Sequence, residues 1–237
     1  MENAMSGAPT PQPIVLAGGI LSFPFIYRDM RAALERITGQ PVWVVQIFTH
    51  DWVPSLLPAA WARLLDRVDR AVRQAVRASP TGKVTLVGHS AGGLLSRMYL
   101  GPKPFRGRAY RGLDYVDHLI TLGSPHYIQH HNPRHGWIPG WLEKHYPDTY
   151  FPQVRYKTIA GKLIYGNRHG TRRERIAYRL YWGLIGYGKA WGDGLVPVAS
   201  ALLRGSSQVI LDGVSHYAGF GGPWYGEEDI IPLWWNA

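Results

Sequence analysis

Short apolar runs rich in β-branched residues recur along the chain and alternate with stretches of helical spacing. These runs predict six buried strands, at residues 14–17, 42–48, 84–87, 116–122, 154–160 and 208–211. Helices are predicted over residues 27–38, ended by Gly39, over 61–76, after Ser90 and over 230–235. Strands that alternate with helices in this way predict βαβ units and a mostly parallel sheet.

Two stretches interrupt the alternation, at residues 125–152 and 162–191. The first is rich in His, Pro, Trp and Tyr, and the second is basic and aromatic. Because strands resume after each, we expect two insertions in a single domain over 13–237, preceded by a flexible tail over 1–12. In the second insertion, the sequence from Thr171 to Glu174 fits a helix capping box.

The third strand run ends in Gly88-His89-Ser90-Ala91-Gly92, and helical spacing follows directly. This G-x-S-x-G pattern at a strand-to-helix corner is typical of a nucleophilic serine, whose Oγ projects above the sheet from a tight, strained turn. The flanking glycines let strand and helix approach closely. The N–H of Ala91, at the helix N-terminus, would then point to the position of an oxyanion.

A nucleophilic serine needs a base and an acid that orients it, and after such a corner they follow in the order Ser, Asp, His. Asp193 stands between two glycines after the second insertion, and His216 follows the last predicted strand. Asp212 is the main rival acid, but it lies close to His216 and at a strand end. We therefore predict a triad of Ser90, His216 and Asp193.

A second oxyanion donor normally comes from the loop after the first core strand, where Gly18-Gly19 frees the backbone. The N–H of Ile20 is the candidate, with that of Leu21 as second choice. Candidate substrate-binding residues are Leu21, His89, Trp191 and Tyr217.

At these residues the chain resembles the α/β-hydrolase superfamily, and more narrowly the lipase-like hydrolases of cyanobacteria and plant plastids, related to the PGAP1-like and class 2 lipases. The matching pieces are "VLAGGIL", "LVGHSAGGLLSRMYL", "VDHLITLGSPH", "WGDGLVPVASALL" and "LDGVSHYAGFGGPWYG". The resemblance implies a doubly wound sheet of about six strands with helices on both faces. It also implies a Ser-His-Asp esterase or lipase that acts on lipid-like esters. The alternatives are an acyltransferase on the same triad and a non-catalytic protein that binds lipid surfaces.

The charge and composition of the chain limit the kinds of partner that it is expected to bind. The chain of 237 residues has 26 basic against 16 acidic residues, a net charge of +10, and no cysteine, which excludes disulfides and thiol catalysis. The arginines are spread in clusters that we expect to be solvated faces, and no nucleic-acid-binding motif accompanies them. No secretory signal is evident at the N-terminus, so we expect a cytoplasmic protein, with peripheral contact to an anionic membrane as an alternative.

That membrane alternative depends on the helix predicted after Thr171. Its apolar residues form a stripe beside arginines, which suits either an anionic membrane surface or the protein core. The stripe consists of Ile176, Ala177, Leu180, Tyr181 and Leu184. A metal site among His126, His130, His131 and His135 is not expected, because prolines interrupt them and no carboxylate stands among them. The predicted chemistry needs no cofactor.

Overall fold

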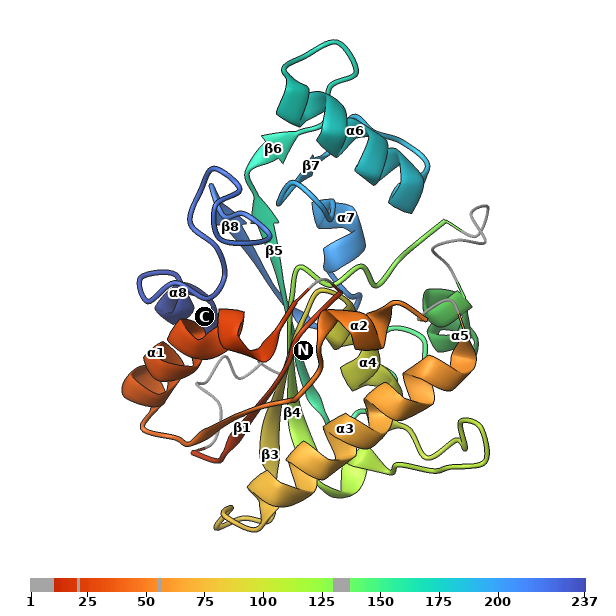
Figure 1. Ribbon diagram of the computed structural model, residues 1–237, viewed down its shortest axis with the longest axis vertical. Coiled ribbons are helices and arrows are strands. Elements are labelled where there is room, and N and C mark those ends of the chain that lie inside the picture. Colours follow the sequence, from red (N-terminus) through yellow and green to blue (C-terminus); the bar gives the residue numbers. More distant parts are fainter. Residues whose placement is uncertain (1–10, 21, 55–56, 130–136) are drawn as a thin grey trace, which may run out of the picture.

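A computed structural model describes residues 11–20, 22–54, 57–129 and 137–237 of the chain. Six strands form one parallel sheet in the order β2-β1-β3-β4-β5-β8 (Figure 1). Their bounds are β1 Ile14–Ala17, β2 Val42–Val44, β3 Val84–His89, β4 Val116–Leu122, β5 Arg155–Lys162 and β8 Ser207–Asp212. The predicted α/β class with a parallel sheet of about six strands is confirmed.

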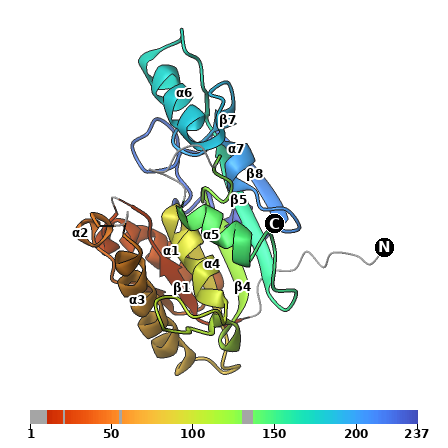
Figure 2. The same ribbon diagram turned by 90° about the vertical axis from the view of Figure 1, so that its right-hand side faces the viewer.

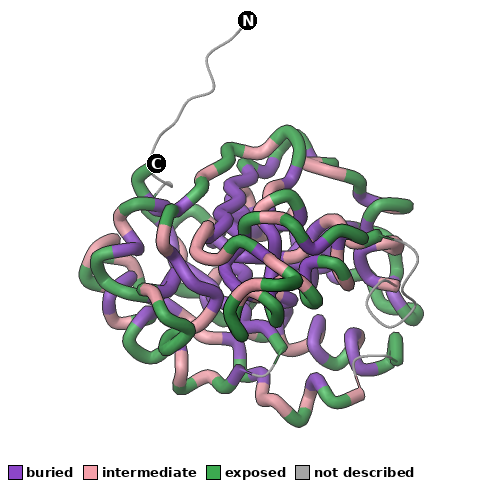
Figure 3. The backbone as a smooth tube through the Cα atoms, turned by 90° about the horizontal axis from the view of Figure 1, so that it is seen from above, coloured by how far each residue is buried: buried purple, intermediate pink, exposed green. Residues whose placement is uncertain are grey.

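Helices cover both faces of the sheet (Figures 1 and 2). On one face lie α1 (Arg28–Thr38) and α8 (Ile231–Trp235), and on the other lie α3 (Pro58–Val76), α4 (Ala91–Leu100) and α5 (Trp137–His145). Side chains of β1 alternate between the two cores, since Ile14 and Leu16 pack towards α1 while Val15 and Ala17 pack towards α3. Buried residues are therefore concentrated in the middle of the molecule (Figure 3).

The helix ends follow local chemistry. Helix α1 stops at Gly39, whose φ of 66° is left-handed and whose N–H donates to the Glu35 carbonyl at 3.0 Å. Helix α3 starts three residues before the predicted position because Pro58 occupies its first turn, where a missing N–H does no harm.

The strand predicted over residues 42–48 is too long. The N–H of Ile47 donates to the Val45 carbonyl at 2.9 Å, which bends the chain out of the sheet. The short helix α2 (Thr49–Trp52) follows, and the Asp51 carboxylate accepts from the N–H of Phe48 at 2.9 Å. A local turn thus overrides the apolar, β-branched pattern of this run.

The order of the strands fixes where a site can form. Strand β1 lies between β2 and β3, so the chain passes from β1 to β2 through α1 on one face and from β2 to β3 through α3 on the other. The loop after β1 leads to α1 on one face, and the loop after β3 leads to α4 on the other. The two loops therefore diverge at the carboxyl ends of their strands. Ligand sites of open parallel sheets lie in the crevice at such a switch point.

The second insertion projects beyond the end of the sheet (Figures 1 and 2). It contains the antiparallel pair β6 (Ile164–Tyr165) and β7 (Trp191–Gly192), with α6 (Arg172–Ile185) between them. The predicted capping box is confirmed, because Thr171 Oγ1 accepts from the N–H of Glu174 while the Glu174 carboxylate accepts from the N–H of Thr171 at 2.6 Å. A further short helix, α7 (Val198–Ala201), precedes β8.

None of the helices in the described part of the chain combines the length and apolar character that a bilayer-spanning helix needs.

Stability is expected to fall in mild acid because of His118 in β4. Its ring is buried and, among the described residues, its Nδ1 has no hydrogen-bond partner, with Asp117 Oδ1 4.0 Å away. Burial, and then the charge of Arg155, lowers the pKa of His118 to about 4, against about 6.5 in an unfolded chain. Between these values the unfolded chain binds a proton that the folded chain does not. The free energy of unfolding is therefore complete above pH 6.5 and falls as the pH drops towards 4, by up to about 1.4 kcal/mol per pH unit.

We expect His118→Gln to remove this contribution and reduce the dependence of the unfolding free energy on pH, as measured by urea unfolding at pH 7 and pH 4.5. Replacing the exposed His169 by Gln is the control. Equal slopes in the wild type and the His118 variant would contradict the assignment.

Candidate active site

Ser90 occupies a sharp turn between β3 and α4. Its φ of 56° and ψ of −128° lie in a region that non-glycine residues rarely adopt. The turn is possible because neighbouring positions carry no side chain. A Cβ on Gly88 would lie 2.5 Å from the Cα of Gly93, and a Cβ on Gly92 would collide with the Ala17 carbonyl. The serine is thus held at the carboxyl end of β3, at the switch point.

The loop after β1 lies directly against this turn. A Cβ on Gly19 would come within 2.6 Å of the Ser90 Cβ, so only glycine permits the approach. The N–H of Gly19 is engaged by the Tyr27 hydroxyl at 3.2 Å. Within the described residues, the N–H groups of Ile20 and Ala91 have no acceptor. Leu21, the second candidate for an oxyanion donor, lies outside the described residues.

His216 and Asp193 form a buried pair. The Nδ1 of His216 lies 2.7 Å from Asp193 Oδ2, and both side chains are 1% exposed. Asp193 Oδ1 accepts from the N–H groups of Leu195 at 3.0 Å and Val196 at 2.8 Å. A carboxylate fixed in this way orients the imidazole so that Nδ1 carries a proton and Nε2 remains free to accept one.

Tyr225 completes the surroundings of Asp193. Its hydroxyl donates to Asp193 Oδ2 at 2.8 Å and accepts from the N–H of Gly161 at 2.7 Å. Burial, followed by the charge of Asp193, raises the pKa of Tyr225 well above its usual value. Sequence reasoning missed this residue, since a tyrosine in an irregular loop gives no periodic signal.

Replacing Tyr225 by Phe is expected to lower kcat/KM about tenfold, the scale typical of a group that orients a catalytic residue. Without this bond the Asp193 carboxylate would attract the His216 imidazolium more strongly. The acidic limb of the pH–rate profile should then move to higher pH, which a purely structural loss would not produce. The control is Tyr156→Phe, because the Tyr156 hydroxyl accepts a hydrogen bond from the N–H of Phe151, away from the candidate active site. An unchanged profile in the Tyr225 variant would refute the role.

His89 joins the serine turn to the histidine loop. Its ring is fully buried, with Nδ1 2.8 Å from the Tyr27 hydroxyl and Nε2 3.1 Å from the His216 carbonyl. Burial lowers the pKa of His89 well below its usual value, so the ring is neutral. Both ring nitrogens are used by the protein. Contact between His89 and a substrate would require one of these bonds to break.

Tyr217 lies between the loop after β1 and His216. Its hydroxyl donates to the Ile20 carbonyl at 2.7 Å, and its ring packs on that of His216 with 4.7 Å between centroids. Among the substrate-binding candidates, His89 directly precedes Ser90, Tyr217 contacts Ile20 and His216, and Leu21 lies outside the described residues.

Trp191 lies on β7, two residues before Asp193, and is 46% exposed. Its ring contacts that of Tyr165 at 5.4 Å, and Lys162 Nζ lies 5.5 Å from its centroid. This tryptophan is part of the surface of the second insertion.

The structure describes the rival acid and part of the histidine run considered in the sequence analysis. The Asp212 side chain is 80% exposed and pairs with Lys162 Nζ at 3.0 Å, whereas His216 bonds Asp193. His126 is buried, and its Nε2 lies 2.9 Å from Thr121 Oγ1. The other three histidines of that run, His130, His131 and His135, lie outside the described residues. In the part of the chain that the structure describes, no group of three or more metal-ligating side chains occurs.

The strand order, the parallel pairing and the helices on both faces give the chain the α/β-hydrolase fold. No family model and no curated protein matches the sequence. Solved structures show a distant likeness. A protein of Xanthomonas campestris pv. campestris assigned to the alpha/beta hydrolase superfamily is 16% identical, with 85% of this chain and 86% of that chain covered and a TM-score of 0.47.

Two further structures are similar over a smaller part. A protein of Lactobacillus plantarum assigned as a cell surface hydrolase is 14% identical, covering 67% of this chain and 72% of that chain, with a TM-score of 0.44. A pyrethroid hydrolase from Sphingobium faniae is 22% identical over 50% of this chain and 42% of that chain, with a TM-score of 0.35.

Proposed function

We propose that this protein is a serine hydrolase that cleaves carboxylic esters through an acyl-enzyme, in line with the lipase-like resemblance of its sequence. The observation that carries the proposal is the convergence of three parts at one switch point. These are a serine on a strained turn, a buried His–Asp pair, and the N–H groups of Ile20 and Ala91, which have no acceptor among the described residues. Each part has a role in acyl transfer, and this combination of roles supports the proposal.

In the proposed mechanism, Ser90 Oγ attacks the ester carbonyl carbon while His216 Nε2 takes the hydroxyl proton. Asp193 stabilises the resulting imidazolium, and the N–H groups of Ala91 and Ile20 bind the oxyanion. The alcohol then leaves with the proton from His216. A water molecule, activated by the same imidazole, attacks the acyl-Ser90 carbonyl and releases the carboxylic acid.

The exposed surface of helix α6 favours the proposal that the substrate is a lipid ester. The predicted apolar stripe divides in the structure, because Ala177 and Tyr181 are buried while Ile176 and Leu180 are 46% and 38% exposed. Trp182, 59% exposed, adds to this outer surface beside the helix arginines. The Tyr181 hydroxyl accepts from the N–H of Gly194 at 3.0 Å, next to Asp193.

The exposed apolar residues and arginines of α6 would bind the surface of an anionic bilayer. Because α6 contacts the loop that carries Asp193, this binding would bring the candidate active site near the bilayer, from which a lipid ester could enter. Flotation with phosphatidylglycerol vesicles tests this contact. It is expected to weaken in Leu180→Asp, and equal flotation of that variant and the wild type would argue against it.

The test of the function is hydrolysis of p-nitrophenyl esters from acetyl to palmitoyl, combined with labelling by a fluorophosphonate. We expect turnover that depends on chain length, and a single labelled peptide that contains Ser90. A protein that neither hydrolyses any ester nor reacts with the fluorophosphonate would refute the proposal. Analysis of products with an added alcohol separates hydrolysis from acyl transfer, since only a transferase forms a new ester in preference to the acid.

A further inference from the structure

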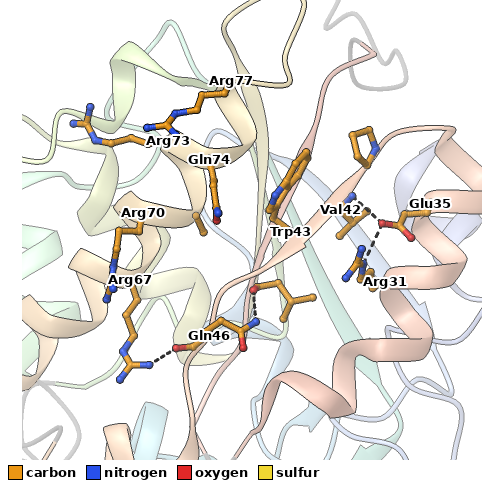
Figure 4. Close-up of a pocket in the computed structure, with 13 residues that line it drawn as sticks. Arg31, Glu35, Val42, Trp43, Gln46, Arg67, Arg70, Arg73, Gln74 and Arg77 are labelled. Atoms are coloured by element: carbon orange, nitrogen blue, oxygen red, sulfur yellow. Dashed lines mark hydrogen bonds and ion pairs between the residues drawn. The ribbon is translucent and has the colours of Figure 1, made fainter.

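A second concave site lies at the free edge of the sheet, on strand β2 between α1 and α3 (Figure 4). Its volume is about 830 Å³, within the range typical of small-molecule sites. None of the residues of the candidate active site lines it. Any ligand here would therefore serve a purpose separate from the proposed ester chemistry.

Arginine dominates this β2-edge groove. Five arginines and one glutamate line it, namely Arg31, Arg67, Arg70, Arg73, Arg77 and Glu35. Arg67 and Arg70 of α3 and Arg77, the residue that caps its end, follow at helical spacing, and the backbone rises about 15 Å from the first to the last of them. Arg31 faces this row from α1 across the groove (Figure 4).

Some of these charges are already compensated by the protein. Arg67 Nη2 bonds Asp51 at 2.7 Å, Arg73 Nε bonds Asp69 at 2.8 Å, and Arg31 Nε bonds Glu35 at 3.0 Å. Arg70 and Arg77 differ, because no carboxylate within the described ranges pairs with either guanidinium group. Arg70 Nε donates to the Asp66 carbonyl at 3.4 Å. Within the described residues, the terminal Nη groups of Arg70 and the guanidinium group of Arg77 therefore remain open to an external anion.

Side chains cap part of the outer edge of this strand. The outward N–H of Val42 donates to Glu35 Oε1 at 3.2 Å, and the outward carbonyl of Val44 accepts from Gln46 Nε2 at 2.9 Å. Arg67 bonds the next outward carbonyl, that of Gln46. Side chains that cap an edge in this way oppose strand addition. A peptide strand or a second copy of the chain would displace these bonds, and a second copy would also bring arginines against arginines.

We propose that the β2-edge groove binds a polyphosphate, an anion with two or more linked phosphoryl groups, chiefly through Arg70 and Arg77. Planar guanidinium forks match phosphoryl oxygens and bind them with paired hydrogen bonds. Linked phosphoryl groups also suit a row of cations better than a single charge does. The recess between two helices is less accessible to a flat bilayer than the outer surface of α6.

Two sources supply this chemistry, an inorganic chain or a nucleotide. Trp43 lines the groove beside α3 and is partly buried, so it offers an apolar surface to a base. The two sources therefore differ in whether the Trp43 ring adds to the affinity.

Calorimetric titration of the full chain with tripolyphosphate, ATP and adenosine in 150 mM salt tests the proposal. Near this ionic strength exposed charges are screened beyond about 8 Å, which suppresses general attraction to the basic surface. We expect tripolyphosphate or ATP to bind and adenosine not to bind. The double variant Arg70→Ala/Arg77→Ala should lose at least tenfold in affinity. Arg70→Lys/Arg77→Lys, which keeps the charge without the fork, should lose part of that.

The matched control is Arg63→Ala, an exposed arginine of α3 outside the groove, which should bind within twofold of the wild type. Loss of affinity in Trp43→Ala for ATP alone would identify a nucleotide, and equal affinities for both anions would identify an inorganic chain. No binding of either anion, or an equal loss in the Arg63 and double variants, would overturn the proposal. Stronger, groove-dependent binding of single-stranded DNA or anionic vesicles would overturn it in favour of a macromolecular partner. Repeating the titration with Ser90→Ala keeps the result independent of the proposed hydrolase activity.

Discussion

Replacing Ser90 by alanine is expected to lower kcat for ester hydrolysis by about 10⁶, the scale of losing the nucleophile of a serine triad. The alanine Cβ occupies the same place as that of serine, so the turn, the His–Asp pair and the two oxyanion donors should remain. The residual rate would then measure what binding and the oxyanion donors provide alone. The measurement is steady-state kinetics with p-nitrophenyl butyrate, with the concentration of folded protein taken from absorbance and the wild-type active sites counted by fluorophosphonate labelling.

Ser79→Ala is the matched control for this prediction. The Ser79 hydroxyl donates to the Lys83 carbonyl at 2.6 Å in the turn before β3, at the opposite end of the sheet from Ser90. Its variant should hydrolyse esters at the wild-type rate. A Ser90→Ala protein that folds and retains more than a hundredth of the activity would eliminate Ser90 as the nucleophile.

Replacing Asp193 by asparagine is expected to lower kcat by about 10⁴ at neutral pH. The side-chain oxygen of asparagine would have to face Leu195 and Val196, because their buried N–H groups need an acceptor. The amide nitrogen would then face His216 Nδ1, and it would favour the tautomer whose proton lies on Nε2. That imidazole cannot accept the serine proton, so the loss arises from a misplaced hydrogen and not from unfolding.

The control is Asp212→Asn, which changes the exposed rival acid and should leave kcat within twofold. The same ester assay at pH 7 compares the two variants, and thermal melting confirms that both fold. If Asp212→Asn lost the activity and Asp193→Asn kept it, the acid would be assigned wrongly, and so would the role of Tyr225.

Much of the fold was predictable because its signals are local. Buried parallel strands are near-continuous β-branched runs, and Gly39 and the box from Thr171 to Glu174 mark helix ends by their own backbone chemistry. The serine turn was predictable for the same reason, since Gly88 and Gly92 lie within two residues of Ser90. The order of Ser90, Asp193 and His216 along the chain added a second, independent restriction.

The contacts that hold the site together were not predictable, because they join positions far apart in the sequence. Tyr225 reaches Asp193 and Gly161 from a loop without periodicity, and His89 is used on both ring nitrogens by groups that only the fold brings near. The β2-edge groove was missed for a related reason. A row of arginines on a helix predicts a solvated face until the neighbouring strand and α1 form the other walls.

The backbone of Ser90 bears on the thermal stability of the whole molecule. A residue other than glycine held in so sparsely populated a conformation costs on the order of 1–3 kcal/mol, whereas domains of this kind are typically stable by only about 5–15 kcal/mol. A glycine at this position would relax the turn and give a more heat-resistant protein. The protein is therefore less stable to heat than its fold allows. This loss of stability arises at Ser90, the residue to which we assign the chemistry.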